Sequence, residues 1–276
     1  MQTLYRKYRP NKFNEVIGQD KIVGALENSI KTGKVGHAYV FAGSRGTGKT
    51  TIARIFADAL SVSQNDLYEI DAASNRGIDD IRAIKDAVNT LPFDSKYKVY
   101  IIDEAHMLTR EAWNALLKTL EEPPAHVIFI LATTEIEKIP DTIMSRCESY
   151  LFRRPDQSVL KQVISRTAKK EGYEIEEEAS DVLALIADGS FRDAHGALQK
   201  IISSLTGKKI SLKDVEDITG APKSELVNSL ISSIDSKDVV KAISIIENIR
   251  QDNLNIKAFT KLLIEKVRAI ILMRIS

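Results

Sequence analysis

Residues 43–50 read Gly-Ser-Arg-Gly-Thr-Gly-Lys-Thr, a complete phosphate-binding loop of the form G-x-x-x-x-G-K-[ST]. An apolar run at 38–42 precedes the loop, and a helical run at 51–57 follows it. A buried strand that opens into a glycine loop and then a helix is the context that this motif requires. The first backbone N–H groups of that helix, and its dipole, would face an anion. The loop therefore predicts an α/β fold that binds a phosphate group at the end of a buried strand.

The side chains of the loop suit a nucleotide with magnesium. Lys49 can reach the β- and γ-phosphates, and the Thr50 hydroxyl can take a magnesium site. The glycines let the backbone approach oxygens that a Cβ would exclude. The expected phosphate-binding residues are Gly43, Ser44, Arg45, Gly46, Thr47, Gly48, Lys49, Thr50 and Thr51. A glycine turn with a purely structural role is the alternative, and the flanking strand and helix argue against it.

Two adjacent carboxylates, Asp103 and Glu104, follow a second apolar run at 99–102. Ligands bind at the carboxyl ends of strands in open α/β sheets. Asp103 can hold Mg²⁺, and Glu104 can polarise a water for in-line attack on a γ-phosphate. Alone, the pair could be an acidic strand end facing solvent, but its position after a phosphate loop favours the ligand interpretation. His106 could relay a signal from the site or could simply pack or cap.

Three further polar residues suit phosphate chemistry. Thr134 follows the apolar run 127–132 and would lie beside the γ-phosphate, between the loop and the acidic strand. A threonine that merely finishes a strand is the plainer alternative. Arg146 and Arg192 lie outside the loop, and a fixed guanidinium can stabilise transition-state charge on a γ-phosphate, in cis or from a neighbour. Either arginine could instead be a surface or ion-pair residue.

The first half of the chain alternates apolar runs with helical patterns, which indicates a parallel sheet covered by helices. The candidate strands are almost continuously apolar, as in strands buried on both faces, at 38–42, 67–70, 99–102, 127–132 and 149–152. Thr109 is a plausible N-cap of a helix that Pro123-Pro124 ends. From residue 156 onward the strand signals stop. Helical patterns follow near 156–171, 176–188, 190–204, 211–218, 223–233, 236–251 and 255–274.

Length and composition limit the remaining possibilities. A chain of 276 residues suggests two domains or three small ones, and a net charge of +1 gives no strong preference for nucleic acid. No apolar run approaches a membrane span and the first residues lack the core of a secretion signal, so we expect a cytoplasmic protein. A single cysteine, Cys147, excludes an internal disulfide and a cysteine-based zinc site. Because the four histidines are also scattered, we expect no zinc.

The motifs, in this order, closely resemble the ATPase (gamma/tau) subunits of bacterial DNA polymerase III clamp loaders, in the AAA+ superfamily. The matching segments are YRKYRP (5–10), FNEVIGQ (13–19), HAY (37–39), the phosphate loop, EIDAAS (69–74), DEAHML (103–108), NALLKTLEEPP (114–124), LATT (131–134), SRC (145–147) and GSFRDA (189–194). The likeness is dense to about residue 205 and thinner beyond. Together these motifs are very specific.

The resemblance implies an architecture and an activity. It implies an α/β P-loop AAA+ domain over 1–153, a small helical lid domain over 154–220 and the start of a helical collar domain over 221–276. ATP and Mg²⁺ would be the cofactors. Family members hydrolyse ATP in a five-subunit assembly, with other clamp-loader subunits, that opens a sliding clamp and places it on primed DNA. The residues expected to line the adenine end of the site are Tyr8, Arg9, Val16 and Ile17.

The resemblance also implies roles for single residues. Thr134 corresponds to the first sensor, and Arg146 to an arginine offered to the ATP of a neighbouring subunit. Arg192 corresponds to the second sensor, which reaches the ATP of its own subunit. DNA would run along helix starts near Arg76 and Arg110. Solvated surface arginines are the alternative at these last two positions.

Two features depart from the pattern of this family. Family members usually carry a four-cysteine zinc module after the phosphate-loop helix, whereas residues 61–66 form a bridge without cysteine. We expect this bridge to be a plain surface turn. The chain also stops partway through the expected collar.

Two rival functions are weighed against an ATP-hydrolysing subunit. A non-hydrolysing structural subunit of the same assembly would not need the intact Lys49, Thr50, Asp103 and Glu104. Another AAA+ enzyme, such as a branch-migration motor, would share the loop and the acidic strand. It would not share the Glu-Glu-Pro-Pro run at 121–124 or the Ser-Arg-Cys run at 145–147 in this setting.

Overall fold

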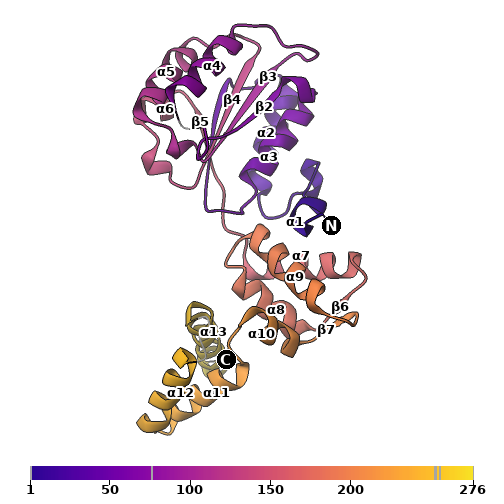
Figure 1. Ribbon diagram of the computed structural model, residues 1–276, viewed down its shortest axis with the longest axis vertical. Coiled ribbons are helices and arrows are strands. Elements are labelled where there is room, and N and C mark those ends of the chain that lie inside the picture. The colour runs from indigo at the N-terminus through magenta and orange to yellow at the C-terminus, as the bar shows by residue number, and fades with distance from the viewer. Residues whose placement is uncertain (1, 76, 252–253, 255, 276) are drawn as a thin grey trace. The chain divides into compact units, whose positions relative to one another are not determined.

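The computed structural model describes residues 2–75, 77–251, 254 and 256–275. The chain divides into two compact units (Figure 1). One unit comprises Arg9–Pro155, and the other comprises Met1–Tyr8 with Asp156–Ser276.

The unit of residues 9–155 is built on a five-stranded parallel sheet. Its strands are β1 (Ala38–Ala42), β2 (Leu67–Asp71), β3 (Lys98–Asp103), β4 (Val127–Thr133) and β5 (Glu148–Leu151). The strand order across the sheet is β2-β3-β4-β1-β5. Because the strands are parallel, β1, β4 and β3 end side by side at one edge, where ligands bind in sheets of this kind.

Helices cover both faces of this sheet, as Figure 1 shows. Those of this unit are α2 (Asp20–Thr32), α3 (Lys49–Ala59), α4 (Ile78–Val88), α5 (Arg110–Glu121) and α6 (Asp141–Met144). Four short 3₁₀ helices among the described residues lie at Phe13–Glu15, Gln64–Asp66, Ala105–Met107 and Ile136–Lys138. As the sequence predicts, the Thr109 hydroxyl caps α5 by accepting a hydrogen bond from Ala112 N. The helix ends before Pro123 because a proline cannot continue it.

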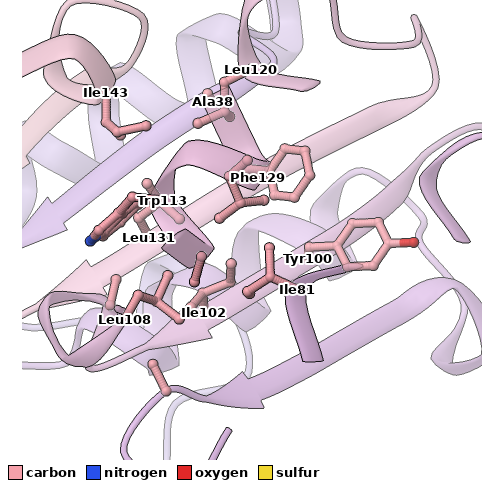
Figure 2. Packing of buried hydrophobic residues seen from close by; sticks show 14 of the residues in the cluster. Ala38, Ile81, Tyr100, Ile102, Leu108, Trp113, Leu120, Phe129, Leu131 and Ile143 are labelled. Carbon is pink, nitrogen blue, oxygen red and sulfur yellow. The ribbon is translucent and has the colours of Figure 1, made fainter. Parts of the chain in front are cut away.

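The alternation of side chains along the strands builds two cores, one on each face of the sheet. On one face, even-numbered residues of β3, such as Tyr100 and Ile102, pack with α4, α5 and α6 (Figure 2). Tyr100 stacks on Phe129 of β4, with ring centroids 5.3 Å apart. On the other face, the odd-numbered residues of β1 and β3, such as Phe41, and the even-numbered residues of β4 pack with α2 and α3. Each fully buried side chain of this size contributes about 1.5–3 kcal/mol, so the central strands are fixed firmly.

The sequence prediction that all five strands are buried on both faces is wrong for β2 and β5. These two strands lie at the edges of the sheet, and several of their side chains face solvent, including Tyr68 and Leu151. An edge strand has a partner on one side only, so less of its surface is covered. The central strands β1, β3 and β4 are buried as expected.

The second unit is mainly helical. Its helices are α1 (Leu4–Lys7), α7 (Gln157–Lys170), α8 (Glu177–Ile186), α9 (Phe191–Ser204), α10 (Leu212–Thr219), α11 (Ser224–Asp235), α12 (Val239–Gln251) and α13 (Ile256–Ile275). The expectation that strands stop at residue 156 needs correction, because β6 (Glu174–Ile175) pairs in parallel with β7 (Lys209–Ile210). These strands are only two residues long, so neither produces an apolar alternation that a sequence pattern could reveal.

Two clusters of buried side chains hold this unit together. The first gathers residues of α7 to α10, and the second gathers residues of α11 to α13, such as Val227, Ile245 and Phe259. The domain boundary expected after residue 220 lies at the end of the first cluster, which also includes Ala221, and the division into three domains stays a prediction. Within the described residues, no helix is both long enough and apolar enough to cross a membrane.

Residues 2–8 belong structurally to the helical unit, whereas the sequence prediction assigns them to the first domain. Leu4 is buried in the first helical cluster, and its backbone N–H donates to Gln199 Oε1 at 2.9 Å. Tyr8 donates its hydroxyl hydrogen to Glu171 Oε1 at 2.5 Å. The first helix of the chain is therefore fastened to helices that lie far along the sequence.

The bridge at 61–66 is not the plain surface turn that the sequence suggests. Its last residue, Asp66, is fully buried and accepts backbone hydrogen bonds from Phe93, Asp94 and Ser95 at 2.5–2.9 Å. Burial by itself would raise the pKa of Asp66, but these hydrogen bonds outweigh it and lower the pKa to about 2. Asp66 therefore fastens the loop before β3 to the end of the bridge.

We predict that Asp66→Asn lowers the free energy of unfolding by roughly 1–3 kcal/mol at pH 7, because an amide replaces one of the two accepting oxygens with an NH2 donor, which leaves at least one backbone N–H without an acceptor. A lowered carboxyl pKa stabilises the fold above the unfolded value near 4, and this contribution is lost as pH falls toward 2. The deficit of the variant should therefore shrink between pH 4 and pH 2. Urea unfolding at both pH values measures this, with the exposed Asp58→Asn as control. An unchanged deficit at pH 2 would contradict the ionised role.

Candidate functional site

The phosphate loop connects β1 to α3 in a conformation that only glycine adopts easily. Gly43 has φ +153°, and a Cβ on it would meet Phe152 O at 2.6 Å. Gly48, the residue before α3, has φ +102°. These positions explain why the motif needs glycine. Gly43 allows the backbone of Phe152 to approach closely, and Gly48 allows the positive φ at the turn into α3.

Polar groups of the loop surround the start of α3. Lys49 is 6% exposed, and its ammonium donates to Gly43 O at 2.8 Å and to Ser44 O at 3.0 Å. Thr47 Oγ1 donates to Ser44 O at 2.9 Å. Ser44 Oγ is buried and has no hydrogen-bond partner among the described residues. A buried hydroxyl without a partner is costly, so this one is a plausible donor to a bound phosphate oxygen.

The acidic end of β3 lies against the start of α3. Thr50 Oγ1 donates to Asp103 Oδ2 at 2.9 Å, and Asp103 Oδ1 accepts from Glu104 N at 3.0 Å. A threonine hydroxyl and a carboxylate at hydrogen-bond distance are oxygen ligands of the kind that Mg²⁺ takes in proteins. These two residues fit the magnesium site that the sequence predicts.

Glu104 directly follows β3, and its side chain contacts the residue after β4. Its backbone has φ +49°, a left-handed conformation that costs about 1 kcal/mol or more for a residue with a side chain. Its carboxylate Oε2 accepts a hydrogen bond from Thr134 Oγ1 at 3.2 Å. Since β4 lies between β1 and β3, the sheet order brings Thr134 between the phosphate loop and the acidic strand.

The residues expected at the adenine end are divided between the two units. Arg9, Val16 and Ile17 are half-buried residues of the sheet unit, where Val16 packs against the core that holds α2 and α3. Tyr8 belongs to the helical unit, where its ring stacks on His195 with centroids 6.4 Å apart. The structure therefore describes their surroundings separately, and their shared role stays a prediction.

Arg146 is held by its own chain. Its guanidinium pairs with Glu121 Oε1 at 2.6 Å and donates to Thr142 O at 2.5 Å and to Ser145 Oγ at 3.1 Å. Its side chain remains 33% exposed. This ion pair is the alternative role that the sequence leaves open, and it brings in Glu121, a residue to which sequence analysis gives no role.

The remaining expected site residues lie on the surface or outside the described part. Arg192 is exposed on the first turn of α9, with its guanidinium 5.7 Å from the centre of the Tyr5 ring. Arg110 is the exposed first residue of α5, and Arg45 is exposed in the phosphate loop. Thr51 is half-buried on α3. Arg76 lies outside the described residues.

The structure adds three residues around the acidic strand that sequence analysis gives little or no role. His106, Thr133 and Glu135 contact one another beside Glu104. The only signal in the sequence is that all three follow a predicted strand within a few residues. The spacing of residues along the sequence does not reveal a contact between the turns that follow two different strands, so these contacts could not be predicted.

The histidine, cysteine and acidic side chains of the described residues form no group of three or more that could hold a metal ion. Cys147 is half-buried, and burial raises the pKa of its thiol to about 11. A thiol with that pKa is a poor metal ligand at neutral pH because the thiolate is the binding form. The expectation that the chain holds no zinc stays a prediction.

Comparison with known proteins agrees with the motifs. A family model described as the delta subunit of DNA polymerase III matches residues 18–76 and 60–156. The chain is 42% identical to the DNA polymerase III subunit gamma/tau of Mycoplasma pneumoniae and 42% identical to the subunit tau of Bacillus subtilis. These matches cover 94% and 91% of the chain, but only 41% and 48% of the relatives, so the chain spans less than half of their length.

Solved structures show the same fold. The Holliday junction branch migration motor RuvB of Thermotoga maritima superposes with a TM-score of 0.66 at 22% identity, over 94% of this chain and 91% of that one. Identity this low shows the fold alone. The superposition confirms the predicted fold class, a parallel sheet flanked by helices and followed by a helical portion.

A shorter relative decides the family. The DNA polymerase III subunit gamma of Buchnera aphidicola (subsp. Schizaphis graminum) is 38% identical over 288 residues. That match covers 97% of this chain and 78% of the relative. The chain therefore belongs to the gamma/tau family of DNA polymerase III subunits.

Proposed function

We propose that this chain is an ATP-hydrolysing motor subunit of a DNA sliding-clamp loader, within a DNA polymerase III complex. It would use ATP binding and hydrolysis to open a clamp and place it on primed DNA during replication. One observation carries the proposal: the phosphate loop, the Thr50–Asp103 pair and the Glu104–Thr134 pair all gather where β1, β4 and β3 end. A chain with surfaces alone would not need this set.

The loop would bind the triphosphate of ATP through its backbone N–H groups and through Lys49. The Lys49 ammonium, now on the carbonyls of Gly43 and Ser44, would turn to the β- and γ-phosphates. Thr50 and Asp103 would hold Mg²⁺, which neutralises charge on the phosphates when bound. Glu104 would orient a water for in-line attack, and Thr134 would donate to the γ-phosphate or to that water.

Two arginines would complete the chemistry, one from each side of a subunit boundary. We assign Arg146 to the ATP of a neighbouring subunit and Arg192 to the ATP of its own chain. The support for Arg146 is its position near the surface, with 33% of its side chain exposed and both terminal nitrogens already oriented. To act in trans, the Arg146 guanidinium would either leave Glu121 or contact Glu121 and a phosphate at the same time.

We infer the partners of the chain from its family. Partners would be the other subunits of a five-membered loader, a sliding clamp and primer–template DNA, in the cytoplasm and without zinc. Residues 154–220 would form a lid and 221–276 part of a collar. Contact with DNA would be to phosphates and independent of base sequence, with Arg110 as one donor at the start of α5.

The rival functions have less support. A branch-migration motor shares the fold at 22% identity, whereas gamma and tau subunits match at 38–42%. A non-hydrolysing subunit would not need Lys49, Asp103 and Glu104 to be held in these contacts. The proposed loader function therefore remains the one that the site supports best.

Glu104→Gln should keep ATP binding and lower kcat by about 10²–10⁴-fold, because an amide cannot act as the base that orients water. Lys49→Ala is the matched comparison, since it should weaken ATP binding as well as turnover. Nucleotide affinity and steady-state ATP hydrolysis by the full chain with its partner subunits measure both effects. Equal loss of ATP affinity in the two variants would argue against Glu104 as the base.

Arg146→Ala should leave ATP binding by the isolated chain close to that of wild type, while turnover by the assembled complex falls by about 10³-fold. Glu121→Ala is the matched control, because it removes the same ion pair and leaves the arginine in place. If the ion pair is the only role of Arg146, both variants will change turnover equally. A weaker affinity for ATP in isolated Arg146→Ala would instead indicate a ligand in cis.

A further inference from the structure

His106 is an almost buried side chain beside the proposed base. It lies in the 3₁₀ helix Ala105–Met107 directly after β3, and its side chain is only 6% exposed. Its Nδ1 is 3.0 Å from Thr133 Oγ1 and 3.6 Å from Glu104 Oε2. Its Nε2 is 3.2 Å from Glu135 Oε1. Both nitrogens of the ring therefore face polar groups, and all three groups lie at or just after the ends of β3 and β4.

The hydrogen bonds of the ring follow from what each partner can donate and accept. A carboxylate only accepts hydrogen bonds, so Nε2 carries a hydrogen and donates it to Glu135. Glu135 is fixed in turn by Lys138, whose ammonium lies 2.7 Å away. Thr133 Oγ1 already accepts from Glu135 N at 3.0 Å, so its own hydroxyl hydrogen is available for Nδ1. In this arrangement the contacts of the ring with Glu135 and Thr133 each have a donor and an acceptor, whereas Glu104 Oε2, 3.6 Å from Nδ1, is not hydrogen-bonded to the ring.

Two connections then link the His106 ring to Glu104. Thr133 is followed directly by Thr134, whose hydroxyl donates to Glu104 Oε2. His106 is two residues after Glu104, in the turn where Met107 N donates to Glu104 O at 2.8 Å. Fixing the ring against Thr133 therefore fixes the distance between the turn that carries Glu104 and the turn that carries Thr134.

We propose that His106 is a positioning residue for Glu104: it holds the Glu104 carboxylate next to Thr134 by bridging the turns that end β3 and β4. This inference rests on the proposed ATPase function. Simple packing is the other interpretation of a buried histidine, and it makes a different prediction. Loss of packing lowers stability, whereas loss of positioning lowers kcat while ATP affinity stays the same.

The first test is ATP turnover by the full chain with its partner subunits, together with ATP affinity. His106→Ala should lower kcat roughly tenfold or more, the scale of losing a group that orients another, while KM and ATP affinity change less than about twofold. His106→Asn, whose amide can take the place of Nδ1 toward Thr133, should recover more turnover than His106→Gln, whose amide reaches the Nε2 position. Recovery by Gln and not by Asn would overturn the assignment.

The matched control is His126→Ala, since the ring of His126 is hydrogen-bonded as well, to two backbone carbonyls at 3.1 Å each, but contacts neither Glu104 nor Thr134. That variant should keep kcat. Thermal unfolding of each variant shows whether it folds. If His106→Ala does not fold, His106→Asn and His106→Gln carry the comparison, and equal wild-type turnover in both would overturn the proposal.

A double-mutant cycle gives the sharpest test, in single-turnover hydrolysis. If His106 acts through Glu104, then His106→Ala should lower the residual rate of Glu104→Gln by less than about twofold. Full additivity of the two losses would overturn the positioning role. The outcomes also separate the two proposals. A wild-type complex without turnover would overturn both, whereas an inactive Glu104→Gln beside a fully active His106→Ala would overturn only this inference.

Discussion

The insertion of β4 between β1 and β3 is the constraint on which the candidate site depends. Parallel pairing makes the three strands end at one edge, and each end carries a different polar group. The phosphate loop follows β1, the two carboxylates follow β3, and the threonines end β4. No single one of these segments holds the whole candidate site, because the residues proposed as the base, the metal ligands and the phosphate-binding loop follow different strands. The buried cores on both faces of the sheet hold those ends in place.

At this edge of the sheet the polar side chains are hydrogen-bonded to one another. Thr50 is hydrogen-bonded to Asp103, Thr134 to Glu104, and His106 bridges Thr133 and Glu135. Each bond crosses from one strand end to another, so the site is ordered before any substrate is considered. Arg146 follows the same rule on the surface, where Glu121 orients it. Preorganised polar groups of this kind are what catalysis by electrostatic stabilisation requires.

Much of this could be predicted from the sequence, for identifiable reasons. The central strands are long apolar runs, the loop has the spacing of a phosphate-binding motif, and Thr109 caps its helix as expected. What could not be predicted depends on tertiary contacts. Asp66 looks like a turn residue until the backbone of residues 93–95 folds onto it. The strands β6 and β7 are too short to leave a pattern, and Glu121 reveals its partner only when α5 and the turn after α6 meet.

The central claim is that this site hydrolyses ATP in order to load a clamp. The most direct test is the rate of ATP hydrolysis by the full chain assembled with its partner subunits, measured alone and then with a sliding clamp and primed DNA. The account predicts turnover that rises when clamp and primed DNA are both present. Turnover that is absent, or that is the same with and without them, would contradict the account.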